Sequence, residues 1–137
     1  MNQHVSFIFD SKLITAIRAL QNGLADIISN RDEQHQFISA HMTVAMGNDV
    51  TFEKIVGPIT TVLNQHDSLP LILESVGVFI GNAIHLAPKP TLELLHVHAE
   101  LVSAMKTVSE VPQWHYPGAW VPHIGIVYPY RNEDMSN

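Results

Sequence analysis

Apolar residues recur along this chain with two different periods, and these periods predict its helices and strands. Spacing of three and four residues, as at Leu13, Ile17, Leu20 and Leu24, is typical of a helix with one buried face. Helices are predicted on this basis over 11–30, 51–66 and 91–108. Short apolar runs of strand length occur over 4–10, 37–46, 71–80, 83–87 and 121–128.

Polar residues, glycines and prolines between these runs predict where the elements begin and end. Asp10 or Ser11 is a suitable N-cap for the first helix. Gly57-Pro58 predicts a bend inside the second helix, because proline lacks a backbone N–H. The polar stretch 31–36 is expected to form a loop, and Gly81-Asn82 is expected to form the turn of a hairpin.

The order of these elements predicts an α+β fold with a partial internal repeat. Strand, helix and strand follow one another over 4–46 and again over 83–128, although the residues themselves are not similar. We expect one domain over 1–137, with lobes of about 4–80 and 81–128 and a tail at 129–137.

The composition excludes several kinds of partner and of chemistry. The 137 residues suffice for one domain with a core, and the absence of cysteine excludes disulfides and thiolate chemistry. Seven Lys and Arg residues against 13 Asp and Glu give a net charge of −6, without a basic stripe for a long nucleic acid. No signal peptide or membrane span is indicated, so we expect a cytoplasmic protein that does not bind membranes.

Two apolar runs each carry a histidine with a small residue two positions later. His41 and Thr43 fall on one face of the predicted strand 37–46, and His123 and Gly125 fall on one face of the predicted strand 121–128. Burial alone does not require an imidazole and a hydroxyl at such positions. Two such histidines facing each other across a cleft supply a general base and a general acid.

These motifs resemble those of the two-histidine (2H) phosphoesterase superfamily, which includes 2′-5′ RNA ligase-like proteins and cyclic phosphodiesterases. The first motif matches fully at His41 and Thr43, and the second matches at His123 and in its Trp120-Val121-Pro122 approach. Gly125 stands where the family has Thr or Ser. The resemblance implies a two-lobed α+β fold in which antiparallel sheets line a central cleft and helices pack outside. The second lobe is expected to be shortened.

The resemblance also implies a function and the residues that perform it. His41 and His123 are expected to be the catalytic acid and base, roughly 5 to 8 Å apart, while Thr43 and Gly125 are expected to border the phosphate. The reaction is hydrolysis of a small nucleotide or RNA-end phosphodiester, such as a 2′,3′-cyclic phosphate or a 2′-5′ linkage. No metal or other cofactor is expected. Gly125 either marks a binding protein that lost catalysis, or lets a backbone N–H or a water replace the hydroxyl.

The remaining candidates are aromatic residues and further histidines. Trp114 and Tyr116 are candidates for stacking on a nucleobase, whereas Trp120 is expected to close the core. His96 and His98 lie two residues apart on a predicted helix and should point in different directions, which disfavours a metal site. His4, His35, His66, His85 and His115 are expected to be surface or loop residues. Two alternatives stay open: a non-catalytic nucleotide-binding or regulatory homologue, and an interaction protein that forms a homo-oligomer through the shortened second lobe.

Overall fold

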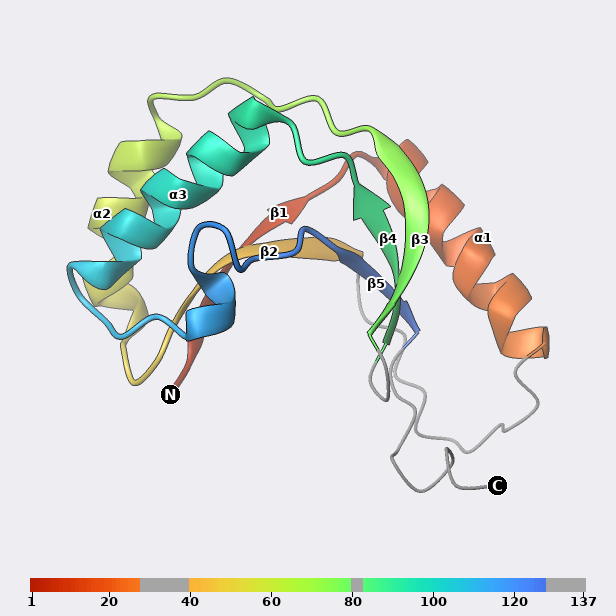
Figure 1. Ribbon diagram of the computed structural model, residues 1–137, viewed down its shortest axis with the longest axis horizontal. Helices are drawn as coiled ribbons and strands as arrows, with labels where there is room; N and C mark the ends of the chain where they lie inside the picture. The colour runs from red at the N-terminus through yellow and green to blue at the C-terminus, as the bar shows by residue number, and fades with distance from the viewer. Residues whose placement is uncertain (28–39, 80–82, 128–137) are drawn as a thin grey trace. The chain divides into compact units, whose positions relative to one another are not determined.

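Helices and strands follow one another in the order that the apolar periods predict (Figure 1). The computed structural model describes residues 1–27, 40–79 and 83–127. The described elements are β1 (Gln3–Ile8), α1 (Ser11–Ile27), β2 (His41–Gly47), α2 (Phe52–Leu63), β3 (Leu73–Phe79), β4 (Ala83–Pro88), α3 (Leu92–Lys106), the short 3-10 helix η1 (Gln113–His115) and β5 (Ile124–Val127). The fold is therefore α+β, with two antiparallel sheets, as expected.

Several predicted segments fall outside the described residues. These are the end of the first helix at 28–30, the loop at 31–36, the start of the first motif strand at 37–39, the Gly81-Asn82 turn and the tail at 129–137. Among the described residues, β2 begins at His41, the first residue of the first motif.

The chain divides into two compact units, and each unit is assembled from three segments. The first unit comprises 1–7, 43–72 and 89–122, and the second comprises 8–42, 73–88 and 123–137. Each unit draws on distant parts of the chain, whereas the lobes expected from the sequence are consecutive stretches. The extent of the single domain over 1–137 stays a prediction.

The first unit is built from most of the β1–β2 sheet and from the helices α2 and α3, which pack side by side (Figure 1). The first two residues of β2, His41 and Met42, fall in the second unit. Both helices turn an apolar face inward, as their spacing predicts. The fully buried side chains of this unit include Val44, Leu94, Leu101, Val102 and Met105. Burial of this apolar stripe, at about 25 cal/mol per Å² removed from water, is the main force that holds α3 in place.

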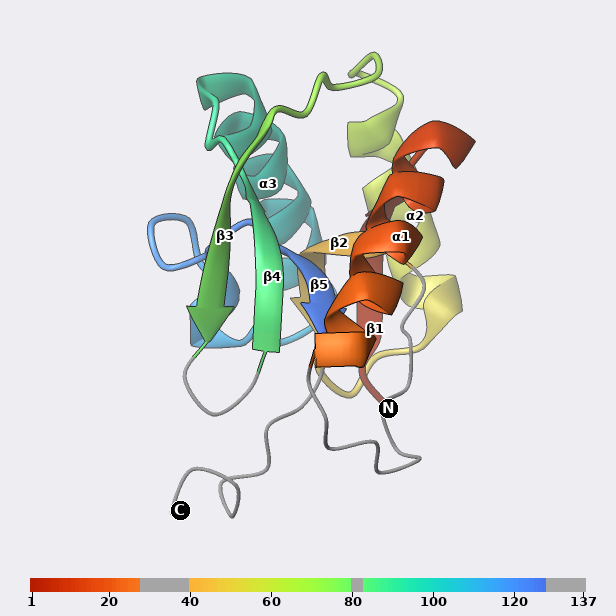
Figure 2. The ribbon, with the colours of Figure 1, turned by 90° about the vertical axis from the view of Figure 1, so that its right-hand side faces the viewer.

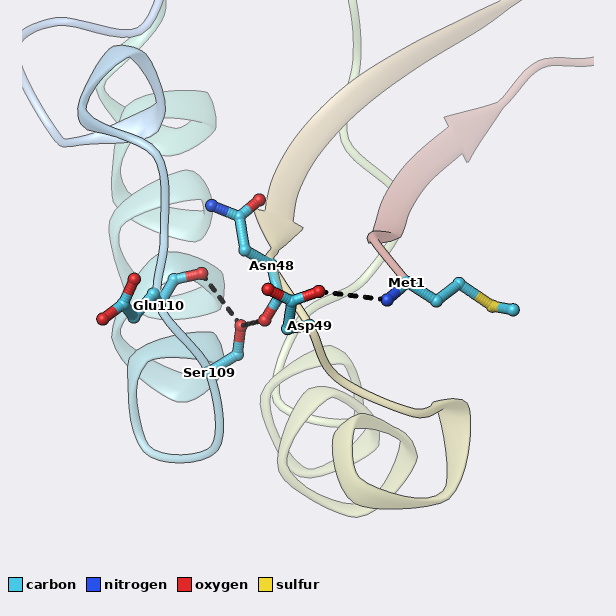
Figure 3. Close-up of polar contacts among 5 residues, drawn as sticks. All are labelled: Met1, Asn48, Asp49, Ser109 and Glu110. Atoms are coloured by element: carbon cyan, nitrogen blue, oxygen red, sulfur yellow. Dashed lines mark hydrogen bonds and ion pairs between the residues drawn. The ribbon is translucent and has the colours of Figure 1, made fainter.

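The end of β2 is tied to the segment after α3 (Figure 3). The Ser109 hydroxyl donates to the backbone oxygens of Asn48, at 3.0 Å, and Glu110, at 2.9 Å. The Asn48 N–H donates to the Glu110 oxygen at 2.8 Å, and the N-terminal amine of Met1 lies 3.2 Å from Asp49 Oδ1. These bonds fix the end of the strand that carries the first motif.

Glycine at the last position of β2 permits this close approach. A Cβ at Gly47 would lie 2.6 Å from both the Met105 sulfur and the Ser109 hydroxyl oxygen. A larger residue would therefore force the side chains of Met105 and Ser109 to shift.

The second unit is built from α1 and a three-stranded sheet with the order β3-β4-β5, in which β4 is central (Figure 2). The hairpin predicted from the sequence is confirmed, because β3 and β4 pair antiparallel. Helix α1 packs on β5. Ile17 of α1 and Ile124 of β5 are almost completely buried, so an apolar layer joins the helix to the sheet.

The helices begin where the sequence supplies a cap. The Asp10 carboxylate accepts the Leu13 N–H at 2.8 Å, so Asp10 rather than Ser11 caps α1. The Thr91 side chain accepts the Leu94 N–H at the start of α3. Helix α2 continues through Pro58, and a bend there stays a prediction. Across the described ranges, we find no helix with both the length and the apolar character needed to cross a membrane.

Candidate functional site

The first motif lies at the start of β2, and its side chains alternate between two environments. Met42 and Val44 are completely buried, whereas His41 and Thr43 are half-buried. The prediction that His41 and Thr43 share one face of a strand is therefore confirmed. The half-buried face leaves both polar side chains partly accessible.

Thr43 is held through its side chain and its backbone. Its hydroxyl oxygen lies 3.3 Å from the hydroxyl oxygen of Ser6 on β1, a distance at which either group can donate. Its backbone oxygen accepts a hydrogen bond from Trp120 Nε1 at 3.2 Å. These contacts give the hydroxyl of the first motif a defined position.

The second motif straddles the start of β5. Ile124 and Ile126 are buried, whereas His123 and Gly125 are half-buried, so the alternation is again as predicted. The predicted start of the strand at 121 was wrong, because β5 begins at Ile124 and His123 precedes it by one residue. Pro122 has no backbone N–H to donate to a neighbouring strand, which accounts for the late start.

Three rings meet beside the second motif. The rings of Phe79 and His85 are stacked, with centroids 4.2 Å apart and planes inclined by 26°. His123 meets both rings edge-on, with centroids 4.9 Å from Phe79 and 5.6 Å from His85. The ring of His123 is thus packed against a stacked pair of rings from the β3–β4 hairpin.

His85 was expected on the surface, and this expectation was wrong. The side chain is only 4% exposed, because it projects from the central strand β4 and is covered by its neighbours. Its Nδ1 is buried and has no hydrogen-bond partner among the described residues. Leaving a buried polar atom unpaired costs about 1 to 3 kcal/mol.

Burial also determines the protonation state of His85. It lowers the pKa of this imidazole, and the charge of the neighbouring His123 lowers the pKa further. At neutral pH His85 is therefore neutral and carries one N–H donor and one acceptor nitrogen. Of the two adjacent rings, His123 is the half-buried one.

The division into units separates the candidate residues into two groups. His41, His123 and Gly125 belong to one unit, together with His85. Thr43, Trp114 and Tyr116 belong to the other unit. The approach of His41 to His123, and the assignment of all these residues to one site, stay predictions.

A model of the 2′-5′ RNA ligase superfamily matches residues 9–137, a range that contains both motifs. The chain belongs to this superfamily. Membership supports a two-histidine phosphoesterase-type function in general, as the resemblance implied. No curated protein matches the chain.

In this superfamily member, the aromatic residues before the second motif differ in exposure. Trp114 is 67% exposed, and Tyr116 is partly exposed with the Lys106 ammonium 3.5 Å from its ring centroid. Their contact with a nucleobase stays a prediction. Trp120 is buried, which confirms that it closes the core.

Trp120 covers a second buried histidine. Its ring stacks on His98 of α3, with centroids 4.0 Å apart and planes inclined by 15°. His98 Nδ1 donates to the backbone oxygen of Val44 at 2.7 Å. Burial lowers the pKa of His98, and the bond to Val44 opposes this shift. His98 therefore links α3 to the strand of the first motif.

The other histidines show where the surface expectation held. His96 is exposed while His98 is buried, so the two point in different directions, as predicted. His4 is exposed, and His66 lies 2.5 Å from the Glu100 carboxylate. His115 is buried, contrary to expectation, because it lies in η1 rather than in an open loop. His35 lies outside the described residues.

Sequence reasoning missed His85, although the sequence held a signal for it. The residues two positions before and after His85 on the same strand face, Ala83 and Ala87, are small, and the opposite strand has glycine at 77. A large polar ring among small residues on a central strand indicates a side chain that needs room. The signal depends on knowing the strand register.

Proposed function

We propose that this protein is a metal-independent phosphodiesterase that hydrolyses a small nucleotide or an RNA-end phosphodiester, with a 2′,3′-cyclic phosphate or a 2′-5′ linkage as substrate. The observation that carries the proposal is the superfamily match over 9–137, because it includes both histidine motifs. The half-buried positions of His41 and His123 in one unit support it.

The chemistry needs one neutral and one protonated imidazole. The neutral ring takes a proton from water as the water oxygen forms a bond to phosphorus. The bond between phosphorus and the leaving ribose oxygen breaks, and the protonated ring gives its proton to that oxygen. Each proton transfer contributes roughly 10² to 10⁴ in rate. Imidazoles titrate near neutral pH, so two histidines can occupy the two states together.

Two contacts support a role for Thr43 in this reaction. A hydroxyl on the same strand face as His41 can donate to a phosphate oxygen and stabilise the charge that develops there. The Ser6 hydroxyl at 3.3 Å and the backbone bond from Trp120 orient this group. We expect loss of the Thr43 hydroxyl to reduce turnover by roughly 10-fold to 10²-fold, less than loss of either histidine.

Gly125 favours one alternative, a nucleotide-binding homologue without catalysis. Position 125 follows His123 as Thr43 follows His41, and it has no hydroxyl to offer. If the second motif binds but does not activate the phosphate, the protein binds cyclic nucleotides without turning them over.

Turnover assays on 2′,3′-cyclic nucleotides and 2′-5′-linked dinucleotides test the proposal. His41→Ala and His123→Ala should each lower turnover by roughly 10² to 10⁴ while the circular dichroism spectrum stays that of the wild type. His4→Gln, which removes an exposed histidine of β1, is the matched control and should keep full activity. EDTA should have no effect.

Two outcomes would count against the proposal. Activity that disappears with EDTA and returns with a divalent ion would show metal-dependent chemistry. Binding of cyclic nucleotides without turnover would favour the non-catalytic homologue.

A further inference from the structure

The row of residues across the middle of the three-stranded sheet is unusual. His85 of β4 pairs directly with Gly77 of β3 on one side and with Gly125 of β5 on the other. Residues directly opposite each other in a sheet project from the same face. A buried imidazole is therefore flanked on both sides by positions without side chains.

Gly77 makes room for the ring of His85. A Cβ at position 77 would lie 2.7 Å from Cε1 of His85 and closer still to Nε2, so the ring occupies the space of a side chain there. The third-nearest ring atom is Cδ2, at 3.2 Å. Nδ1 is thus on the part of the ring turned away from Gly77, while Gly125 flanks β4 on the other side.

Nδ1 is also the atom that lacks a partner. It is buried and has no hydrogen bond to any described residue, while the ring touches His123 edge-on. A phenylalanine would pack in the same place without an unpaired polar atom. The unpaired nitrogen therefore lowers the stability of the fold, and a hydrogen bond to a ligand would remove this cost.

The two motifs of the chain differ at one polar group. The first has the Thr43 hydroxyl two residues after His41, and the second has Gly125 two residues after His123. The side chain directly across from Gly125 is His85. A neutral imidazole donates a hydrogen bond as a hydroxyl does.

We propose that His85 is a third ligand-binding histidine, whose Nδ1–H donates to a phosphate oxygen of the ligand beside His123 and replaces the hydroxyl that Gly125 lacks. This inference rests on the proposed function for the identity of the ligand, a small phosphate ester. Because Nδ1 is covered, side chains around it have to move before a phosphate oxygen reaches it, and the ring of His123 is one of those packed against His85.

Binding of inorganic phosphate, followed by NMR of the imidazole signals, tests this contact. In the wild type, the signals of His85 and His123 should shift over the same range of phosphate concentration. His85→Phe keeps a ring on Phe79 but removes Nδ1, and it should bind phosphate about tenfold more weakly, which corresponds to about 1.4 kcal/mol. His4→Gln should bind as the wild type does.

A second substitution separates a role in binding from a role in packing. Gly125→Thr restores a hydroxyl across from position 85, so the double variant His85→Phe/Gly125→Thr should recover most of the lost affinity. His85→Phe should also unfold at the same or a higher temperature than the wild type, because it removes an unpaired buried nitrogen.

Several results would overturn the inference. They are a wild type that binds no phosphate, a His85→Phe variant with unchanged affinity, and a loss of affinity that accompanies lower stability and is not recovered by Gly125→Thr. Turnover of 2′,3′-cyclic nucleotides is judged separately. Phosphate binding through His85 without turnover refutes the proposed function alone, whereas turnover with unchanged phosphate affinity in His85→Phe refutes this inference alone.

Discussion

Each of the two units buries a histidine against an aromatic ring, but the two histidines are held in different ways. His98 stacks on Trp120 at 4.0 Å and donates from Nδ1 to the Val44 backbone oxygen. His85 stacks on Phe79 at 4.2 Å, and its Nδ1 has no partner among the described residues. Burial lowers the pKa of both.

The difference indicates which histidine serves the fold. A neutral imidazole has one N–H group. His98 uses this group to donate a hydrogen bond to the Val44 backbone oxygen, in the strand that carries the first motif. The Nδ1 of His85 makes no such bond among the described residues, and its ring packs edge-on against the histidine of the second motif. Each ring has a buried nitrogen without a partner among the described residues, Nδ1 in His85 and Nε2 in His98, so the bond from His98 Nδ1 to Val44 is what distinguishes them.

Replacing each histidine by phenylalanine should give the largest contrast. His98→Phe leaves the Val44 carbonyl without this donor, so the free energy of unfolding should fall by about 1 to 3 kcal/mol. His85→Phe should leave the free energy of unfolding unchanged or raise it. Urea unfolding followed by circular dichroism measures both, and an equal loss in the two variants would erase the distinction.

Lowering the pH should destabilise the protein through both histidines. Each has a folded-state pKa below the unfolded value, near 6.5, so below that pH the unfolded chain binds more protons than the folded chain. Stability should therefore be full above about pH 6.5 and should fall on acidification, by at most about 1.4 kcal/mol per pH unit for each histidine.

Single substitutions show which histidine causes this loss of stability at low pH. His85→Phe and His98→Phe should each flatten the dependence of the free energy of unfolding on pH below 6.5. Denaturant unfolding at a series of pH values measures the slope. Slopes that match the wild type in both variants would mean that neither histidine is held neutral in the folded protein.

The smallest effects on stability are expected when a glycine in open space and a glycine beside His85 are each replaced by alanine. Gly23→Ala, in α1 with open space around the new methyl, should stabilise the protein by about 0.5 to 1 kcal/mol. Gly77→Ala forces the His85 ring to shift and should destabilise it by about 1 kcal/mol. Thermal unfolding compares them, and a stabilising Gly77→Ala would show that the ring moves without cost.

Much of the fold could be predicted because the relevant signals are local. The helical spacing of apolar residues gave α1, α2 and α3, and alternation gave the shared faces of His41 with Thr43 and of His123 with Gly125. Trp120 was expected to close the core, and it is buried. Motif residues two positions apart need no long-range information, because strand geometry alone orients them.

The burial of His85 and its pairing with Gly125 could not be predicted because they depend on register. A two-residue turn at Gly81-Asn82 would pair residues 80 and 83, whereas the structure pairs Phe79 with Ala83. A shift of one residue moves every side chain of a strand to the other face relative to its partner. The pairing of His85 with Gly125 adds a contact between residues 40 positions apart, with a register shift beside it.

A crystal structure grown with inorganic phosphate tests the central claim most directly, because paired-histidine chemistry requires both rings at one anion. We predict a single phosphate with one nitrogen of His41 and one of His123 each within about 2.7 to 3.2 Å of its oxygens, and with His85 Nδ1 donating to the same group. A phosphate bound away from both motifs, or imidazoles of His41 and His123 that face different surfaces, would contradict the account.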